Sequence, residues 1–179
     1  MPTYAVLLRA VNVGRRRVQM ERVRELLSDN GFTDVATYIN SGNVRVTTGT
    51  RTPTGVGAEV RRLLSHEFGF DIPCVARTVA DLAAVAAQVD ATPSPLGDDA
   101  HTYVCFLDSE PDEAAAADLG QWDVDGERAQ VLGAQVVIWL TTPLPKARLS
   151  NARIEKLTGR VGTQRDAKVV RTLATRWGG

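Results

Sequence analysis

The chain has 179 residues, of which 44% are hydrophobic and 23% are charged, and its formal net charge at pH 7 is zero. These values are ordinary for a globular protein. No apolar run approaches the ~20 residues that span a bilayer, and the N-terminus enters a strand pattern without a basic and apolar leader. Cys74 and Cys105 stand alone in strand-like segments, which favours two free thiols over a disulfide. We therefore expect a cytoplasmic protein with no membrane partner.

The charges are unevenly distributed along the chain. Residues 9–24 hold six arginines against one acid, a net charge of +5, and residues 146–179 hold nine basic residues against two acids, a net charge of +7. Residues 77–128 hold two arginines against twelve acids, a net charge of −10. Two interpretations stay open: the basic ends bind an anionic partner, or the basic and acidic faces neutralise each other.

The first half of the chain predicts a β-α-β-β-α-β order. The expected strands are residues 3–9, 35–39, 43–48 and 72–77, and the expected helices are residues 18–30 and 53–68. The first strand is apolar on both sides, which is typical of a central strand. Pro73 cannot donate to a ladder, so the last strand is expected at a sheet edge. This order predicts a ferredoxin-like α/β plait over residues 1–78.

The second half predicts a similar but incomplete order. Residues 79–100 are expected to form a helix, which begins at a capping-box-like Thr78–Asp81 segment, and then a linker rich in Pro and Asp. Strands are expected at 101–107, 127–132 and 135–141, and helices at 109–119, 149–157 and 167–177. No last strand is evident after the helix at 149–157. Residues 101–179 therefore predict a second, irregular plait with extra C-terminal helices, and the fold class is α+β.

Two polar loops form the predicted site. The first, residues 9–14, ends the first strand, and the second, residues 38–43, joins the next two strands. A plait places both loops at the end of the sheet where the first helix begins, and free helical N–H groups favour an anion there. Arg15, Arg16 and Arg17 are expected to gather at the same place. The predicted ligand-binding residues are Arg9, Asn12, Gly14, Tyr38, Asn40, Ser41, Asn43, Lys156 and Arg165.

The loop residues also have a purely structural interpretation. Asn12 and Gly14 are suited to shaping a turn after a strand, and Ser41 is suited to shaping a hairpin. Arg9 differs, because an arginine at the end of a central strand needs carboxylate, carbonyl or ligand partners. Lys156 and Arg165 are included because the C-terminal helices carry an apolar stripe. With no last strand in their own unit, these helices are expected to dock on the first half.

Several segments of the chain form a recognisable pattern that covers nearly its whole length: residues 7–14, Met20, Leu26, Gly31-Phe32, residues 37–44, residues 149–151 and residues 155–157. In these segments the chain resembles the bacterial family called domain of unknown function 1697. The resemblance implies a pair of α/β plaits. Because the biochemical function of the family is not established, the resemblance assigns no catalytic residues to this chain. Members usually have a second glycine where this chain has Arg15. They also typically end in a threonine-arginine-asparagine-tryptophan-like motif, in which this chain keeps Arg165 but has Asp166 and Ala167 in place of the amide and the indole.

The sequence contains neither a phosphate-binding Gly-x-x-x-x-Gly-Lys-Ser/Thr loop nor a Gly-x-Ser-x-Gly elbow. His66 and His101 are the only histidines, and the cysteines lack zinc spacing. We therefore expect no metal and no cofactor, and the sequence indicates neither catalytic residues nor whether the protein is an enzyme. The acidic pair Asp98-Asp99 is interpreted as a solvated loop.

Three functions stay open. The first is binding of a small anionic ligand at the two loops. The second is nucleic-acid binding by the basic ends, against which the zero net charge and the absence of an aromatic residue from strand 43–48 both weigh. The third is a protein-interaction or structural module that packs through its sheet faces. The sequence does not indicate the oligomeric state.

Overall fold

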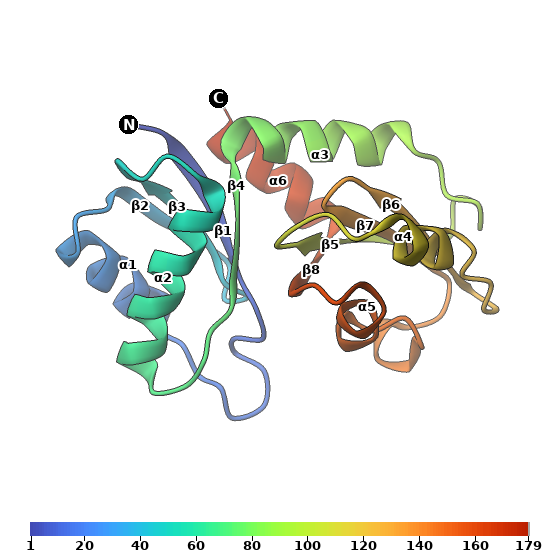
Figure 1. The fold of residues 1–179 in the computed structure, drawn as a ribbon, viewed down its shortest axis with the longest axis horizontal. Coiled ribbons are helices and arrows are strands. Elements are labelled where there is room, and N and C mark those ends of the chain that lie inside the picture. The colour runs from blue at the N-terminus through green and yellow to red at the C-terminus, as the bar shows by residue number, and fades with distance from the viewer. Residues whose placement is uncertain (179) are drawn as a thin grey trace. The chain divides into compact units, whose positions relative to one another are not determined.

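The computed structural model of the protein describes residues 1–178 (Figure 1). Residue 179, the end of the second predicted unit, lies outside the described residues. The chain divides into two compact units, one made of residues 1–83 and the C-terminal residues from Leu173 onward, and the other of residues 84–172. The helices α3 (Val79–Ala91) and α6 (Ala167–Trp177) carry the chain between them. No helix in this part of the chain is long and apolar enough to cross a bilayer.

The first unit has the predicted β-α-β-β-α-β order. Its elements are β1 (Thr3–Leu8), α1 (Met20–Asp29), β2 (Thr33–Tyr38), β3 (Asn43–Thr47), α2 (Pro53–Phe68) and β4 (Cys74–Thr78). The strands form an antiparallel sheet in the order β2-β3-β1-β4. The fully buried Val6 pairs with Val44 of β3 on one side and with Ala76 of β4 on the other. β1 is therefore central and β4 is an edge, which confirms the inference from Pro73.

The core of the first unit lies between one face of this sheet and the helices α1 and α2. It joins Tyr4, Val6 and Leu8 of β1 to apolar residues of both helices. α1 ends as predicted: Gly31 has φ +87°, and the backbone N–H of Phe32 donates to Leu27 at 3.1 Å, which closes the last turn. A Cβ on Gly57 would lie 3.1 Å from the carbonyl oxygen of Cys74. Glycine in this helix therefore permits close packing of α2 on β4.

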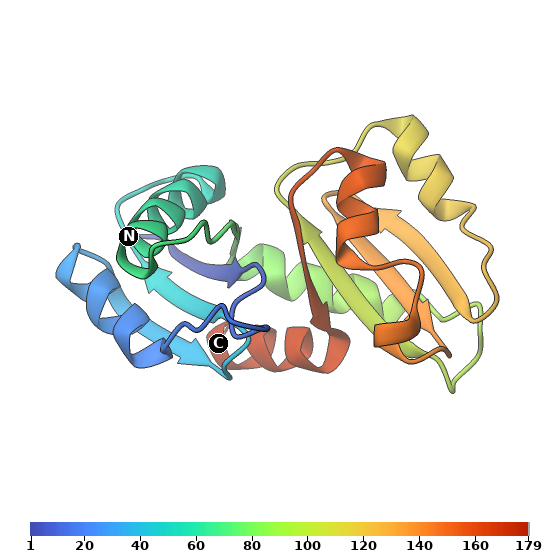
Figure 2. The ribbon, with the colours of Figure 1, turned by 90° about the horizontal axis from the view of Figure 1, so that it is seen from below.

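The second unit contains the last strand that the sequence analysis missed. Its elements are β5 (His101–Leu107), α4 (Glu113–Gly120), β6 (Glu127–Leu132), β7 (Gln135–Leu140), the 3-10 helix η1 (Leu144–Lys146), α5 (Asn151–Thr158) and β8 (Gly162–Asp166). The sheet order is β6-β7-β5-β8. β8 pairs antiparallel with β5, as in Tyr103 opposite Asp166. The prediction of an irregular unit with a missing or replaced strand was therefore wrong. Figure 2 shows α5 lying across the strands of this sheet.

The missed strand β8 and the wrongly predicted start of α4 each have a physical reason. β8 reads Gly-Thr-Gln-Arg-Asp, which is poor in strand-forming residues, so only its ladder with β5 establishes it as a strand. α4 was expected to begin at Ser109, but it begins at Glu113. The carboxylate of Asp112 accepts the N–H of Ala115 at 2.8 Å and caps the helix there. Pro111 therefore precedes the helix and is not in its first turn.

A buried carboxylate organises one loop of the second unit. Glu127 is 2% exposed and accepts the backbone N–H groups of Arg148 at 2.6 Å and Leu149 at 2.9 Å. It also accepts the indole N–H of Trp122 at 3.2 Å. The segment after β7 is therefore held against the core of its own unit, because a buried carboxylate needs donors of this kind.

Candidate functional site

The two polar loops of the first unit meet, as the sequence analysis predicted. We call residues 9–19 and 39–42 together the rim. The side-chain amide of Asn12 donates to the carbonyl oxygen of Asn40 at 2.6 Å. The backbone N–H of Leu8, at the end of β1, donates to the carbonyl of Gly42 at 2.8 Å. The order β2-β3-β1 brings the βα loop and the hairpin turn to one end of the sheet.

Asn12 holds the rim together with every polar atom of its side chain. Besides the bond to Asn40, its Nδ2 donates to the carbonyl of Val18 at 2.9 Å, and its Oδ1 accepts the N–H of Val18 at 2.9 Å. Its φ of +57° lies in the left-handed region that asparagine tolerates better than most residues. Asn12 is thus a structural residue that closes the loop.

Asn43 and Gly42 have an equally structural role in the hairpin. Asn43 is fully buried, and its Nδ2 donates to the carbonyl of Tyr38 at 3.0 Å and to the hydroxyl of Ser41 at 3.1 Å. Gly42 has φ +87°, and a Cβ there would lie 2.7 Å from both Leu8 Cβ and Val11 Cγ2. Only glycine fits that position, and Asn43 secures the turn from within the protein.

The other predicted residues of the first unit are distributed around the rim. Arg9 is half-buried, and its backbone N–H donates to the carbonyl of Pro73 at 2.9 Å. The ring of Tyr38 lies under the guanidinium of Arg176, 5.1 Å from its centroid. Gly14 is exposed with φ +59° and open space around it. Of this set, Asn40 and Ser41 leave the most side-chain surface to solvent.

Lys156 and Arg165 belong to the second unit. Lys156 is exposed on α5. Arg165 of β8 is buried, and one terminal nitrogen donates to Thr163 Oγ1 and to the carbonyl of Gln164, both at 2.8 Å. Burial lowers the pKa of the Arg165 guanidinium to about 10. The expected approach of these two residues to the rim stays a prediction.

An open hollow of about 900 Å³ lies beside the rim, at the beginning of α1. Its lining residues are Asn12, Arg17, Val18, Gln19, Met20, Glu21, Arg24 and Asn40. Gln19 occupies the N-cap position of α1 without forming a side-chain cap. The guanidinium of Arg17 has no partner among residues 1–178, and Arg24 uses one terminal nitrogen to donate to Thr37 at 2.7 Å. The hollow is therefore flanked by two cations and an uncapped helix end.

The three consecutive arginines of the rim have different environments. The guanidinium of Arg16 lies 4.8 Å from the ring centroid of Phe70 and donates to the carbonyl of Asp71. Arg15 is exposed and does not line the hollow. Only Arg17 combines an unpartnered guanidinium with a place at the hollow. Sequence reasoning had placed it near the site but had missed Gln19 and Arg24, whose positions depend on where α1 begins.

The rim backbone is locally strained. Ala10, Asn12 and Ile39 have φ values of +54°, +57° and +49°, a region that costs about 1–2 kcal/mol for a residue with a Cβ. Ile39 is β-branched, which makes this conformation unusual, and its side chain is 47% exposed. Strain of this kind persists where the surrounding bonds enforce it, and the Asn12–Asn40 bond lies directly beside Ile39.

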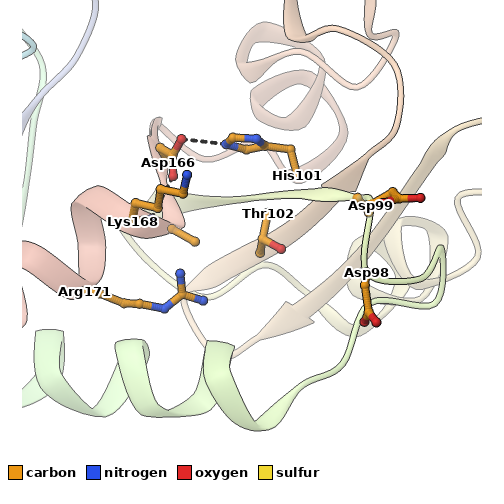
Figure 3. Close-up of a pocket in the computed structure, with 9 residues that line it drawn as sticks. Asp98, Asp99, His101, Thr102, Asp166, Lys168 and Arg171 are labelled. Carbon is orange, nitrogen blue, oxygen red and sulfur yellow. Dashed lines mark hydrogen bonds and ion pairs between the residues drawn. The ribbon is translucent and has the colours of Figure 1, made fainter.

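A second hollow, of about 370 Å³, lies in the second unit (Figure 3). It is lined by Asp98, Asp99, Ala100, His101, Thr102, Asp166, Ala167, Lys168 and Arg171. His101 Nε2 and Asp166 Oδ2 are 2.6 Å apart, and the imidazole stacks on Tyr103 with centroids 4.7 Å apart. The other carboxylate oxygen of Asp166 accepts the N–H of Lys168 at 2.7 Å. Both ring and carboxylate are thereby oriented.

The electrostatics of the pair follow from these contacts. Burial acts to raise the pKa of Asp166, but the hydrogen bonds from His101 and from the Lys168 backbone outweigh it, so the pKa is lowered. Burial, together with the charge of Asp166, raises the pKa of the Tyr103 hydroxyl. Within the described residues, no group of three His, Cys, Asp or Glu side chains is arranged to hold a metal ion.

Sequence reasoning missed this second hollow. His101 begins β5 and Asp166 ends β8, so the pair forms only if β8 lies beside β5. One signal pointed there: Asp166 stands where the resembled family has an amide. Because the predicted second unit had no β8 strand, nothing in the prediction placed Asp166 beside His101.

The comparisons with known proteins place the fold and the family. No curated protein matches the chain. A solved structure described as that of a conserved bacterial protein from Streptococcus pneumoniae aligns with a TM-score of 0.72 over 100% of this chain and 99% of the other, at 22% identity. At that identity the likeness shows the fold alone. The model of the family described as "Protein of unknown function (DUF1697)" matches residues 1–137. The resemblance noted in the sequence is thereby confirmed, and the chain belongs to the DUF1697 family.

Proposed function

We propose that the protein binds a small anionic ligand in the hollow beside the rim. The observation that carries the proposal is the N-terminus of α1, which opens into a hollow flanked by Arg17 and Arg24 and has no side-chain cap. Each unit is inferred to be a ferredoxin-like plait, a fold that hosts many unrelated functions. The proposal therefore rests on this site and not on the fold.

Three features favour an anion here. The first N–H groups of a helix point outward without intrahelical partners, and the helix dipole adds positive potential. The Arg17 guanidinium is unpartnered in the described part of the chain, and Arg24 keeps donors beyond its bond to Thr37. Glu21 is the one carboxylate in the lining. Its charge reduces the positive potential and favours ligands that also carry a hydrogen-bond donor.

The rigid rim supports recognition of a small ligand. Asn12 ties the two loops with three hydrogen bonds, so the floor of the hollow is preorganised and a ligand does not have to order it.

A nitrogen–proton NMR titration with phosphate, sulfate and acetate tests the proposal. Signals of residues 17–24 are expected to shift saturably for at least one of these anions. Arg17→Ala and Arg24→Ala should each weaken binding about 10-fold to 150-fold, because a charge-assisted hydrogen bond contributes about 1.5–3 kcal/mol. Arg15→Ala is the matched control, since it removes the same charge from the same loop outside the hollow.

Two results would contradict the proposal. One is the absence of any saturable shift at residues 17–24 with every anion. The other is an equal loss in Arg15→Ala and Arg17→Ala, which would indicate diffuse electrostatic attraction. A mixed oligonucleotide in the same titration covers the alternative of nucleic-acid binding. A steep loss of oligonucleotide affinity with rising salt concentration would favour nucleic-acid binding. The remaining alternative, an interaction module that packs through its sheet faces, predicts an oligomer in light scattering.

A further inference from the structure

The hollow of the second unit collects polar atoms that form no hydrogen bond or ion pair within residues 1–178, although the charge of Lys168 also acts on Asp166. They are the terminal nitrogens of Arg171, Nζ of Lys168, Oγ1 of Thr102 and Nδ1 of His101, and none of them forms a hydrogen bond or ion pair within residues 1–178. Figure 3 shows Arg171 extending toward Thr102. Three of these groups are donors at neutral pH, and His101 becomes a fourth when it is protonated.

Two of these side chains, those of Arg171 and His101, are held in place by neighbouring groups. Arg171 donates from Nε to Asp90 Oδ1 of α3 at 2.6 Å, which leaves its two terminal nitrogens directed elsewhere. His101 is held by Asp166 and by its stack on Tyr103. Asp90 and Asp166 are positioning residues, because each uses its carboxylate on a side chain that faces the hollow. A preorganised donor set loses less entropy on binding.

We propose that this hollow binds the phosphate group of a small phosphorylated molecule. A guanidinium with two open terminal nitrogens matches two phosphate oxygens, and a lysine serves phosphate as a point charge. The hydroxyl of Thr102 and the imidazolium of His101 supply further donors. A carboxylate has two oxygens and would leave part of this donor set unmatched, whereas a phosphate monoester presents three terminal oxygens. The proposal is independent of the anion site at the rim.

Three carboxylates of the lining oppose an anion: Asp166, which is engaged by His101 and by the Lys168 backbone, and the two residues that sharpen the test, Asp98 and Asp99. Asp98 and Asp99 lie on the loop before β5 and are exposed. In Figure 3 the carboxylate of Asp99 is turned away from the His101–Asp166 pair. Like charges repel at this range and are partly screened by salt. Asp99→Asn is therefore expected to strengthen phosphate binding, opposite in sign to the basic variants.

Protonation of His101 links the site to pH. The charged groups around its ring are Asp166 of β8, Lys168 and Arg171 of α6, and Asp98 and Asp99 of the preceding loop, while Tyr103 of β5 is neutral at pH 7. A histidine in water is protonated below about pH 6.5. Since an anion favours the imidazolium, sulfate binding should strengthen as the pH falls from about 8 to about 6.

The test is an NMR pH titration of the histidine ring signals in the full chain. It is recorded without added anion, with sodium sulfate, with sodium phosphate and with sodium acetate, all at the same ionic strength. Sulfate keeps its double negative charge throughout, so it separates protonation of His101 from protonation of phosphate. His66 of α2, the other histidine, is the internal control.

The expected result is a saturable shift of the His101 signals with phosphate and sulfate, weaker with acetate, and no comparable shift at His66. Lys168→Ala and Arg171→Ala should each weaken phosphate binding about tenfold. His101→Asn should abolish the strengthening of sulfate binding between about pH 8 and pH 6. Thr102→Val, which keeps shape and removes the donor, should weaken phosphate binding about threefold to tenfold.

The proposal is overturned if His101 and His66 respond alike, if the basic variants bind phosphate as the unaltered chain does, or if acetate matches phosphate. Arg17→Ala separates this proposal from the function proposed for the rim. It should leave the His101 response unchanged even where it abolishes the shifts at residues 17–24. Loss of both responses in that one variant would contradict the existence of two sites.

Discussion

The rim of the first unit and the hollow of the second unit use their polar side chains in opposite ways. Asn12 of the rim and Asn43, which directly follows the rim in β3, donate their side-chain N–H groups to carbonyl and hydroxyl oxygens of the same unit. In the hollow, Lys168 and Thr102 have side-chain polar atoms without a protein partner in the described residues. The most conspicuous polar motif in the sequence is therefore largely scaffold.

The difference shows how a polar motif divides into scaffold and binding groups. Buried amides must be hydrogen-bonded, because an unsatisfied buried polar group costs about 1–3 kcal/mol. A residue that satisfies this demand inside the protein has little left for a ligand. Groups at the edge of a hollow face water and stay available. Variants that separate stability from binding therefore test the comparison directly.

The largest expected effect belongs to Gly42→Ala. A Cβ at this position would lie 2.7 Å from Leu8 Cβ, and φ is +87°. Overpacking costs about 1–3 kcal/mol and the left-handed conformation about 1–2 kcal/mol, so we expect a loss of about 3 kcal/mol. Urea unfolding followed by circular dichroism measures it. Gly14→Ala is the control, with φ +59° and open space around it, and should lose only about 1 kcal/mol.

Asn12→Ala should lower the free energy of unfolding by about 2 kcal/mol, since it removes three hydrogen bonds and leaves the groups of Val18 without this partner. Asn40→Ala keeps the carbonyl that accepts from Asn12 and removes an exposed side chain, so it should stay within about 0.5 kcal/mol of the unaltered chain. Equal losses in the two variants would show that Asn12 does not close the rim.

Asp166→Asn should have a smaller effect that depends on pH. The pKa of Asp166 is lowered in the folded protein: burial opposes the change, and the hydrogen bonds from His101 and Lys168 outweigh it. The carboxylate therefore stabilises the folded protein at pH values above the pKa of the unfolded state, which is ordinarily 3.8. This stabilisation is lost as the pH falls through the lower pKa of the folded state. We expect a loss of about 0.5–1 kcal/mol at neutral pH.

Unfolding curves of this variant at neutral and acidic pH test the sign. The difference from the unaltered chain should shrink toward zero in acid. Asp118→Asn changes an exposed residue of α4 whose side chain forms no hydrogen bond or ion pair among residues 1–178, and it should show no such trend. A difference that grows as pH falls would mean that the carboxylate is not stabilised by its partners.

The smallest stability effects are expected for Lys168→Ala and Thr102→Val. Neither side chain has a polar partner among residues 1–178, so each change should alter the free energy of unfolding by at most about 0.5 kcal/mol. Parallel thermal unfolding with and without phosphate measures stability and binding together. If either variant destabilised the chain as much as Asn12→Ala, the contrast between scaffold and binding groups would be wrong.

The sequence by itself determined the first unit in considerable detail. Alternating and helical apolar patterns identified its elements, Pro73 placed β4 at an edge, and Gly31 marked the end of α1. These features are local: they depend on side-chain periodicity and on the φ angles that proline and glycine favour. The meeting of the two loops followed from the predicted topology, because the predicted plait has few ways to connect its strands.

Only the tertiary structure decided which polar side chains are engaged within the protein and where the second sheet ends. Asn12 resembles a ligand-binding residue until Val18 and Asn40 are seen to occupy its amide. β8 carries little strand propensity of its own and exists because β5 offers it a ladder. The pairing of Asp166 with His101, 65 positions apart in the chain, depends on that ladder. Contacts between residues so distant in sequence leave no local pattern, because they arise only when the sheet forms.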